Sequence, residues 1–186
     1  MALRIIAGEL KGRKLRTIPG LKTRPTADRT REAVFSILGS AVGGAHVLDV
    51  FAGTGAFGLE ALSRGAASAL FIENGRDALN ALAGNIQACD LSERVSVIRW
   101  DAGRNLNCLG NREPKFDLVF LDPPYGRGLV MPALFNLHAA CCLRNGARLV
   151  VEHGVHDPFA DPGAPYPLRD RRRYGKTLVS FLDYVI

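Results

Sequence analysis

Long hydrophobic runs are missing from this 186-residue sequence. No apolar stretch approaches the roughly 20 residues that a helix needs to cross a bilayer. The first nine residues, MALRIIAGE, also lack the apolar region of a secretory signal peptide. These absences argue against a membrane protein and predict a cytoplasmic one. The length suits one well-buried domain with a small appendage.

Metal-ligand spacing is missing as well. The chain has four cysteines and four histidines, and neither set shows the paired spacing of a metal site or a disulfide framework. The adjacent pair Cys141-Cys142 lies in an apolar stretch, where cysteines usually remain buried free thiols. We therefore predict free thiols and no bound metal.

Negative charge is scarce at both ends of the chain. Residues 1–31 carry nine Lys or Arg against two acidic residues, and residues 169–176 carry five against one. Residues 32–168 are mildly acidic, with ten basic and fourteen acidic side chains. A basic run is often only a solvated face, but two basic ends around an acidic body are typical of a protein that holds a polyanion. The charge pattern favours a nucleic-acid partner.

From residue 46 onward, apolar strand-like runs alternate with helix-like segments. Such alternation predicts βαβ units around a mostly parallel sheet. The predicted strands cover residues 46–50, 69–73, 95–99, 116–121 and 148–151, and the predicted helices cover 56–64, 76–89, 102–109 and 130–143.

The N-terminal part departs from this alternation. Residues 4–8 and 13–16 predict a short β-hairpin with Gly12 available for the turn. A helix is then predicted from Pro25 to Gly39, and its apolar face is expected to carry Ala33, Val34, Ile37 and Leu38.

The C-terminal part departs from it too. Residues 169–174 and 177–185 read as two strands around a tight turn, so an antiparallel hairpin is expected to close the sheet. We therefore divide the chain into a basic N-terminal hairpin extension, residues 1–24, and an α/β domain, residues 25–186.

Asp122-Pro123-Pro124-Tyr125 follows the predicted strand 116–121. The grouping suits methylation of an amino group on an aromatic base, whose nitrogen is a poor nucleophile because its lone pair is delocalised into the ring. The Asp122 carboxylate and the Pro123 carbonyl could accept hydrogen bonds from that amino group, and the rigid prolines could fix their direction. Tyr125 could stack on a base swung out of its helix. The alternative is a plain turn after a strand.

Glycines follow the first predicted parallel strand. The pattern Gly53-x-Gly55-x-x-Gly58, with Glu73 twenty residues after Gly53, matches the dinucleotide-binding fingerprint. A nicotinamide-dependent dehydrogenase therefore stays open. Asp49 argues against it, because a carboxylate ahead of the glycines suits the ammonium of a methionine moiety better than a pyrophosphate. Little chain is left for the substrate domain that a dehydrogenase usually needs.

Acidic residues follow successive predicted strands at Asp49, Glu73, Asp101 and Asp122. Open α/β sheets bind ligands at the carboxyl edge of their strands, so one site is expected there. Glu73 suits two ribose hydroxyls and Asp101 suits an adenine amino group, although Asp101 could equally be a solvated turn residue. The order of these residues favours an S-adenosylmethionine-dependent methyltransferase that acts on an amino nitrogen.

The sequence resembles the RsmD family, the bacterial guanine-N2 methyltransferases of small-subunit ribosomal RNA. The resemblance covers nearly the whole chain and includes Asp122-Pro123-Pro124-Tyr125 and the tail Tyr174-Gly175-x-Thr177. Its other blocks are Arg4-Ile5-Ile6-Ala7-Gly8 with Gly12-Arg13-Lys14-Leu15, Arg24-Pro25-Thr26-x-Asp28-Arg29-x-Arg31-Glu32, and Asp49-x-Phe51-Ala52-Gly53-Thr54-Gly55-x-x-Gly58-Leu59-Glu60-Ala61-Leu62-Ser63-Arg64-Gly65.

The resemblance implies a Rossmann-like class I methyltransferase fold with an N-terminal hairpin extension. It implies methyl transfer from S-adenosylmethionine to N2 of one guanine in 16S ribosomal RNA, on an assembling small subunit. A monomer is expected. Basic residues that would hold RNA phosphates are Arg4, Lys11, Arg13, Lys14, Arg171, Arg172 and Arg173.

The resemblance also implies roles for individual residues. Glu73 would contact the cofactor's ribose, and Asp101 with Ala102 its adenine. The target base would be held by Asp122, Pro123, Pro124 and Tyr125, with Asp122 also beside the cofactor. The methionine end of the cofactor would be lined by Asp49, Gly53 and Gly55, with Thr26 and Arg24 near it. Phe51 would also bind the cofactor.

Size favours RNA over DNA, because a sequence-reading DNA methyltransferase generally needs a large recognition domain for which this chain has no room. Structured RNA can instead present a splayed base. Three alternatives stay open. An adenine-N6 or other nucleic-acid amino methyltransferase would share Asp-Pro-Pro-Tyr, a NAD-dependent oxidoreductase would use the glycine loop, and a non-catalytic RNA-binding protein would use only the basic ends.

Overall fold

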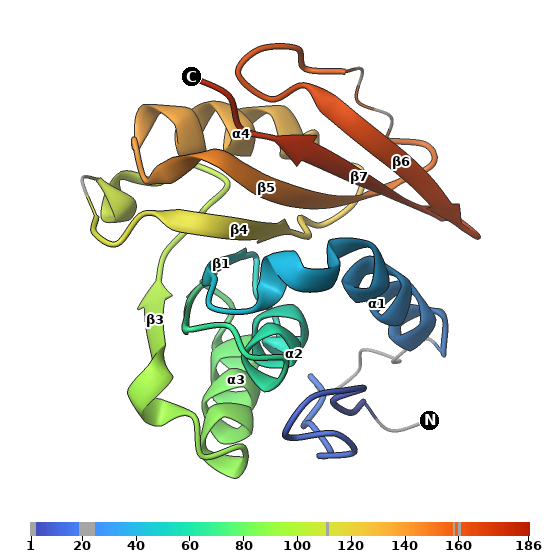
Figure 1. The fold of residues 1–186 in the computed structure, drawn as a ribbon, viewed down its shortest axis with the longest axis vertical. Helices are drawn as coiled ribbons and strands as arrows, with labels where there is room; N and C mark the ends of the chain where they lie inside the picture. Colours follow the sequence, from blue (N-terminus) through green and yellow to red (C-terminus); the bar gives the residue numbers. More distant parts are fainter. Residues whose placement is uncertain (1–2, 19–24, 111, 158, 160) are drawn as a thin grey trace.

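A seven-stranded sheet forms the centre of the molecule (Figure 1). The computed structural model describes residues 3–18, 25–110, 112–157, 159 and 161–186. The α-helices are α1 (Pro25–Leu38), α2 (Ala56–Ser63), α3 (Arg76–Ala88) and α4 (Val130–Ala139). The strands are β1 (His46–Val50), β2 (Ser68–Glu73), β3 (Val95–Arg99), β4 (Phe116–Leu121), β5 (Leu143–Gly154), β6 (Leu168–Tyr174) and β7 (Thr177–Asp183). Short 3-10 helices are η1 (Gly39–Val42), η2 (Ser92–Arg94) and η3 (Asn107–Leu109).

The strand order is β3-β2-β1-β4-β5-β7-β6. Strands β1 to β5 pair in parallel, and β7 lies antiparallel between β5 and β6. The predicted parallel sheet closed by an antiparallel C-terminal hairpin is therefore confirmed. The order reverses at β1 and β4, which is where open α/β sheets bind their ligands.

Two apolar layers cover the sheet because successive strand residues point to opposite faces. In β1, Val47 packs with α1, α2 and α3, whereas Leu48 and Val50 pack with α4 and the residues around η3. All three side chains are fully buried. The near-continuous apolar strands of this sequence are thus explained by a sheet that is covered on both faces.

Helix α1 runs over the predicted residues, but its buried face differs from the prediction. Val34, Phe35 and Leu38 are buried, while Ile37 is 39% exposed. Phe35 takes the place expected for Ile37 because its ring packs 5.5 Å from that of Phe120 on β4. The large aromatic ring fills the gap between helix and sheet, and Ile37 turns outward.

Two predicted helices are wrong in whole or in part. Residues 102–109 form turns and only the short η3, because Asp101 and Asn105 accept hydrogen bonds from nearby backbone N–H groups and so compete with a helix. The helix predicted to reach residue 143 ends at Ala139, and Cys141 adopts a left-handed φ of 49°. Strand β5 then begins at Leu143, opposite Phe116.

Residues 3–18, the described part of the N-terminal segment, form the predicted hairpin contact but no regular strand. Arg4 and Lys14 make one antiparallel bridge, and the Ile5 N–H donates to the Arg13 carbonyl at 3.0 Å. Within the described ranges, no helix is long and apolar enough to cross a membrane. The division into an extension, residues 1–24, and a domain, residues 25–186, stays a prediction.

A buried carboxylate, Glu60 on α2, ties this segment to the domain. Its oxygens accept hydrogen bonds from the N–H groups of Ile6 at 2.7 Å and Ala7 at 3.0 Å. Arg64 lies 2.7 Å and Arg31 3.7 Å from the same carboxylate. Glu60 is fully buried and Arg31 nearly so, whereas the Arg64 side chain keeps 21% of its surface exposed. The segment is therefore held by a charged network at the helix that follows the glycine loop.

We expect Glu60→Gln to lower the free energy of unfolding by about 3–5 kcal/mol, because Arg31 and Arg64 would lose a buried counter-ion. Denaturant unfolding monitored by circular dichroism measures this. The control is Glu32→Gln, the same change at an exposed position of α1, for which a change within about 0.5 kcal/mol is expected. Equal stabilities of the two variants would contradict the proposed role of the network.

Candidate functional site

Asp49 is the most buried acidic group at the carboxyl edge of the sheet. It lies in β1, is 2% exposed, and its Oδ2 accepts the Gly58 N–H at 2.9 Å. Burial raises the pKa of Asp49 to about 8, the Gly58 hydrogen bond lowers it, and the nearby charge of Glu73 raises it. A cation placed beside this carboxylate would favour its ionised form.

The glycine loop wraps around Asp49. Phe51, Gly53 and Gly55 have positive φ values of 61°, 56° and 79°. A Cβ at Gly58 would lie 2.4 Å from the Phe71 ring, so only glycine lets α2 approach the sheet this closely. A Cβ at Gly53 would meet no atom within 4 Å, so that backbone faces open space where a ligand could approach it.

Glu73, at the end of β2, supports the same loop. Its Oε2 accepts the Gly53 N–H at 2.7 Å, and its Oε1 accepts the N–H groups of Asn74 and Gly75 at 2.8 and 2.7 Å. The carboxylate therefore connects the ends of β1 and β2. Its predicted contact with ribose hydroxyls stays a prediction.

Asp101 and Ala102 follow β3, farther along the same edge. The Asp101 side chain is 45% exposed, accepts the Gly103 N–H at 3.1 Å and pairs with Arg104 at 3.2 Å. Ala102 is buried. The Trp100 N–H donates to the Glu73 carbonyl at 3.1 Å, which brings this turn to the end of β2.

The Asp122 loop begins beside β1, because the Asp122 N–H donates to the Val50 carbonyl at 3.4 Å. Pro123 is buried, whereas Pro124 and Tyr125 are exposed. Burial raises the pKa of Asp122 well above its ordinary value, and the negative charges of Glu152 and Asp49 raise it further. Asp122 therefore belongs to the same electrostatic cluster as Asp49.

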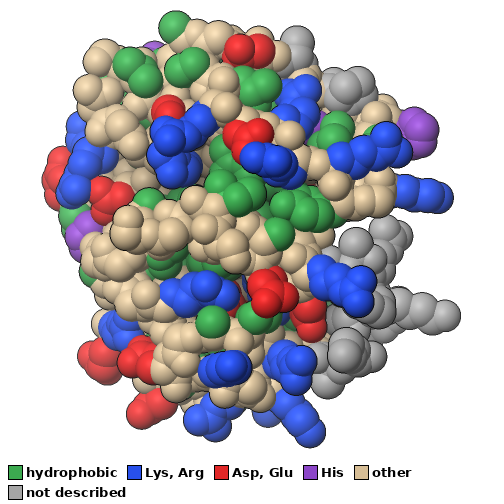
Figure 2. All heavy atoms as spheres, turned by 45° about the vertical axis from the view of Figure 1, so that its right-hand side comes forward, with side chains coloured by type: hydrophobic (Ala, Val, Ile, Leu, Met, Phe, Trp, Pro, Cys, Tyr) green, Lys and Arg blue, Asp and Glu red, His purple; other side chains and the backbone are tan. Residues whose placement is uncertain are grey.

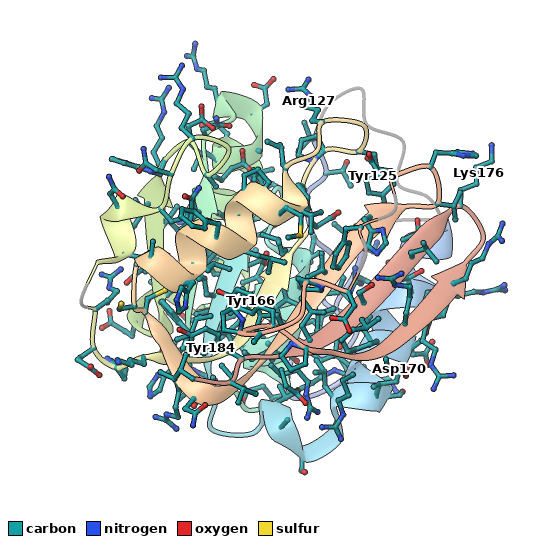
Figure 3. The ribbon with its side chains drawn as sticks, turned by 90° about the horizontal axis from the view of Figure 1, so that it is seen from above. Tyr125, Arg127, Tyr166, Asp170, Lys176 and Tyr184 are labelled. Atoms are coloured by element: carbon teal, nitrogen blue, oxygen red, sulfur yellow. The ribbon has the colours of Figure 1, made fainter. Side chains whose placement is uncertain are left out.

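Tyr125 connects the Asp122 loop to strands β5 and β7. Its hydroxyl donates to Glu152 Oε1 at 2.6 Å and lies 3.2 Å from Thr177 Oγ1 at the start of β7. Figure 3 shows Tyr125 at the same end of the molecule as Arg127 and Lys176. A cavity of about 120 Å³ adjoins the loop and is lined by Pro123, Pro124, Tyr125, Leu129, His153 and Phe159.

The structure thus brings Asp49, the glycine loop, Glu73 and Asp122 together, with Asp101 at the margin. Of the predicted residues, Arg24 lies outside the described residues, as does the side chain of Thr26, whose backbone is in α1. Glu152 and Glu60 were missed by sequence reasoning. A signal for Glu152 was its place directly after the strand predicted for residues 148–151, although β5 continues to Gly154 in the structure.

The basic residues are arranged unevenly. Arg4, Lys11, Arg13 and Lys14 are exposed on the N-terminal hairpin. Figure 2 shows Lys and Arg side chains on the lower part of one face and at its upper right, with hydrophobic side chains between.

The arginines Arg171, Arg172 and Arg173 of β6 all make hydrogen bonds or ion pairs with other groups of the protein. Arg171 turns inward, where Nε donates to Ser180 Oγ and Nη2 to the Phe159 carbonyl, both at 2.9 Å. Arg172 pairs with Asp170 at 2.8 Å, and Arg173 Nε donates to the Gly175 carbonyl at 3.0 Å. Arg172 and Arg173 are exposed, so they are better placed for a phosphate than Arg171.

Comparisons with known proteins agree with this architecture. Residues 3–183 match the model of the family described as conserved hypothetical protein 95. The ribosomal RNA small subunit methyltransferase D of Escherichia coli is 34% identical over 174 residues, which cover 94% of this chain and 86% of that protein. The enzyme of the same name from Haemophilus influenzae is 34% identical over 160 residues, or 86% of this chain and 83% of that one.

Solved structures share the fold. The Escherichia coli protein yhhF, described as a proposed methyltransferase, superposes with a TM-score of 0.86 at 31% identity, covering 100% of this chain and 99% of that one. A methylase-like protein of Haemophilus influenzae, HI0767, has a TM-score of 0.81 at 30% identity and covers 100% of both chains. The Rossmann-like methyltransferase fold predicted from the sequence is confirmed.

Proposed function

Because the chain belongs to the family described as conserved hypothetical protein 95, the RsmD family of methyltransferases, we propose that it methylates ribosomal RNA of the small subunit. The methyl donor is S-adenosylmethionine, and the acceptor is the exocyclic N2 of one guanine in 16S ribosomal RNA of an assembling subunit. One observation carries the proposal: Asp49, a buried carboxylate, and Asp122, a half-buried one, lie within electrostatic reach at the switch point of the sheet.

The donor end of the site fits this cofactor. A buried carboxylate at Asp49 suits an ammonium group, and the open side of Gly53 admits a ligand close to the backbone. Glu73 would face the ribose, and Asp101 with Ala102 the adenine. Bound S-adenosylmethionine supplies an electrophilic methyl group on a sulfonium. The chain's part is to orient that methyl group toward the Asp122 loop.

The acceptor end supplies hydrogen-bond acceptors rather than a strong nucleophile. The Asp122 carboxylate and the Pro123 carbonyl would accept the two N–H bonds of the target amine, which frees its lone pair for in-line attack. As the nitrogen bonds to the methyl carbon, the bond from that carbon to sulfur would break and its electron pair would return to sulfur, leaving S-adenosylhomocysteine. The nitrogen would then lose a proton to Asp122. The raised pKa makes Asp122 a stronger proton acceptor than an exposed aspartate, which suits that last step.

RNA would be held by the exposed basic residues of the N-terminal hairpin, Arg4, Lys11, Arg13 and Lys14, and by the β6 arginines Arg172 and Arg173. Phosphate contacts position the substrate without reading its sequence. The choice of guanine is left to the acceptor pocket and to the fold of the RNA.

The protonation state of Asp49 is expected to change when the cofactor binds. With a pKa of about 8 in the free protein, most of this carboxyl is protonated at pH 7, and a bound cation favours its ionised form. Cofactor binding at pH 7 is therefore expected to release nearly one proton from Asp49. Calorimetry in two buffers of different ionisation enthalpy measures the release.

Asp49→Asn is the matched control, since an amide oxygen can still accept the Gly58 N–H but carries no proton to release. The variant should release close to one proton fewer than the wild type. Equal proton release by the two proteins would show that Asp49 does not face the cofactor's charge.

The overall proposal is tested with labelled S-adenosylmethionine and small subunits from a strain that lacks the endogenous activity. Digestion and mass analysis should show N2-methylguanosine at one position. N6-methyladenosine would support the adenine alternative, and no incorporation would favour a non-catalytic RNA-binding protein. Calorimetric binding of NAD without binding of S-adenosylmethionine would support the oxidoreductase.

A further inference from the structure

Glu152 lies within β5, beside the point where the chain leaves β4 at Asp122. Strands β4 and β5 run parallel, and Leu121 lies opposite Val151. Asp122, the residue after β4, and Glu152, within β5, are therefore neighbours across the two strands. The negative charge of Glu152 acts on the Asp122 carboxyl and raises its pKa. Glu152 is also paired with Val179 of β7, which fixes its backbone between two neighbouring strands.

Glu152 also holds Tyr125 in place. The Tyr125 hydroxyl donates to Glu152 Oε1 at 2.6 Å. Its ring packs against Gly154, where a Cβ would lie only 3.4 Å from Tyr125 Cδ2. The Tyr125 side chain nevertheless remains 42% exposed. The ring is thus fixed at its hydroxyl and against the sheet, while part of its surface remains open to a ligand.

The carboxylates of Asp122 and Glu152 lie close to other acidic groups, and hydrogen-bond donors from a ligand would stabilise their charges. Burial raises the pKa of Glu152, and the Tyr125 hydrogen bond lowers it. The pKa of Asp122 is raised by burial, by Glu152 and by Asp49. The groups near the two carboxylates include the Tyr125 hydroxyl, which donates to Glu152, and Asp49, which is itself a carboxylate. An aromatic edge with several adjacent N–H groups would satisfy carboxylates in such a setting.

Guanine and adenine differ at the ring nitrogen next to their amino group. In guanine that nitrogen, N1, carries a hydrogen, so N1–H and the N2 amino group form a row of donors. In adenine, N1 has a lone pair beside the N6 amino group. A carboxylate next to the one that binds the amino group would therefore accept a hydrogen bond from guanine and repel adenine.

We infer that Glu152 is the specificity-determining residue of the acceptor site, whose carboxylate accepts guanine N1–H while it holds Tyr125 as one wall of the base pocket. The inference rests on the proposed function and adds the choice of base to it. Asp122 binds the amino group in either base, so the selectivity comes from its neighbour.

The test compares two acceptors with the wild type and Glu152→Gln. Reconstituted small subunits carry either guanosine or 2-aminopurine at the mapped position; 2-aminopurine keeps the amino group but has a lone pair at N1. The wild type should prefer guanosine in kcat/KM by roughly 100-fold or more, because a site that bonds an N–H strongly rejects an analogue without it.

Glu152→Gln should reduce this preference to within about tenfold, because an amide can turn to offer either a donor or an acceptor. Glu152→Asp, which withdraws the carboxylate by one methylene, should also reduce the preference for guanosine. This variant replaces Glu152→Gln in the test if the glutamine variant does not fold. Tyr125→Phe should slow the methylation of guanosine and of 2-aminopurine by the same factor. Glu93→Gln, the same change on exposed η2 at the far edge of the sheet, should keep the wild-type ratio.

The outcomes separate the inference from the proposal on which it rests. If the wild type methylates N2 of guanosine and the Glu152 variants keep the wild-type ratio, the role of Glu152 is refuted and the proposed function stands. If the wild type methylates neither acceptor, the proposed function fails and the inference fails with it.

Discussion

Asp122→Ala is expected to lower kcat for methyl transfer by roughly 10³-fold or more while S-adenosylmethionine binding stays within a fewfold of the wild type. The reason is that, in the proposed function, the carboxylate would accept a hydrogen bond from the acceptor amine, and groups that act mainly in the transition state contribute about 10²–10⁴-fold each. Single-turnover transfer to small subunits measures the rate, and calorimetry measures cofactor binding.

Asp122→Asn refines this test. The amide keeps one oxygen that can accept an N–H bond, so its rate should lie between those of the wild type and the alanine variant. It cannot take up the proton that the nitrogen loses, so its rate should respond less to pH on the acid side. An alanine variant with wild-type turnover would refute the assignment of Asp122.

Charge reversal at Arg13 and Lys14 is expected to weaken RNA binding by roughly ten- to hundredfold at low salt. Both side chains are exposed on the N-terminal hairpin, which Glu60 holds against α2. Loss of two phosphate contacts should also reduce the slope of log affinity against log salt by about 1.5. Binding of small subunits or their RNA across a salt series measures both quantities.

A control of equal charge separates a local contact from the effect of net charge. Lys115→Glu with Arg144→Glu makes the same charge change at the starts of β4 and β5, the edge opposite the Asp122 loop. That variant should keep a salt slope close to the wild-type value. If the two double variants weaken binding equally, the hairpin is not the site of RNA contact.

Local patterns predicted most of the domain. Strand-length apolar runs placed β1 to β4 within one residue, and the strand-end carboxylates Asp49, Glu73 and Asp122 meet at the edge where the parallel topology requires them. These features depend on the alternation of elements and on the direction of strands, both of which are written in short stretches of sequence.

Contacts between distant residues were not predictable in the same way. Glu60 lies in an apolar helix, and its partners Ile6 and Ala7 are more than fifty residues away. Tyr125 was expected only to stack on a base, yet its hydroxyl reaches Glu152 on the next strand. Arg171 was expected on the surface but bonds to Ser180 and Phe159. A local sequence pattern does not predict which of several neighbouring side chains of the same type, such as the β6 arginines, turns toward the protein interior.

A structure of the protein with bound S-adenosylmethionine would show whether the two carboxylates serve the roles proposed for them. We expect the cofactor's ammonium to lie beside Asp49 and its methyl carbon to point into a gap bounded by the Asp122 carboxylate and the Pro123 carbonyl, with room for a purine against Tyr125. A methyl carbon directed away from Asp122, or a gap filled by side chains in the complex, would contradict these roles.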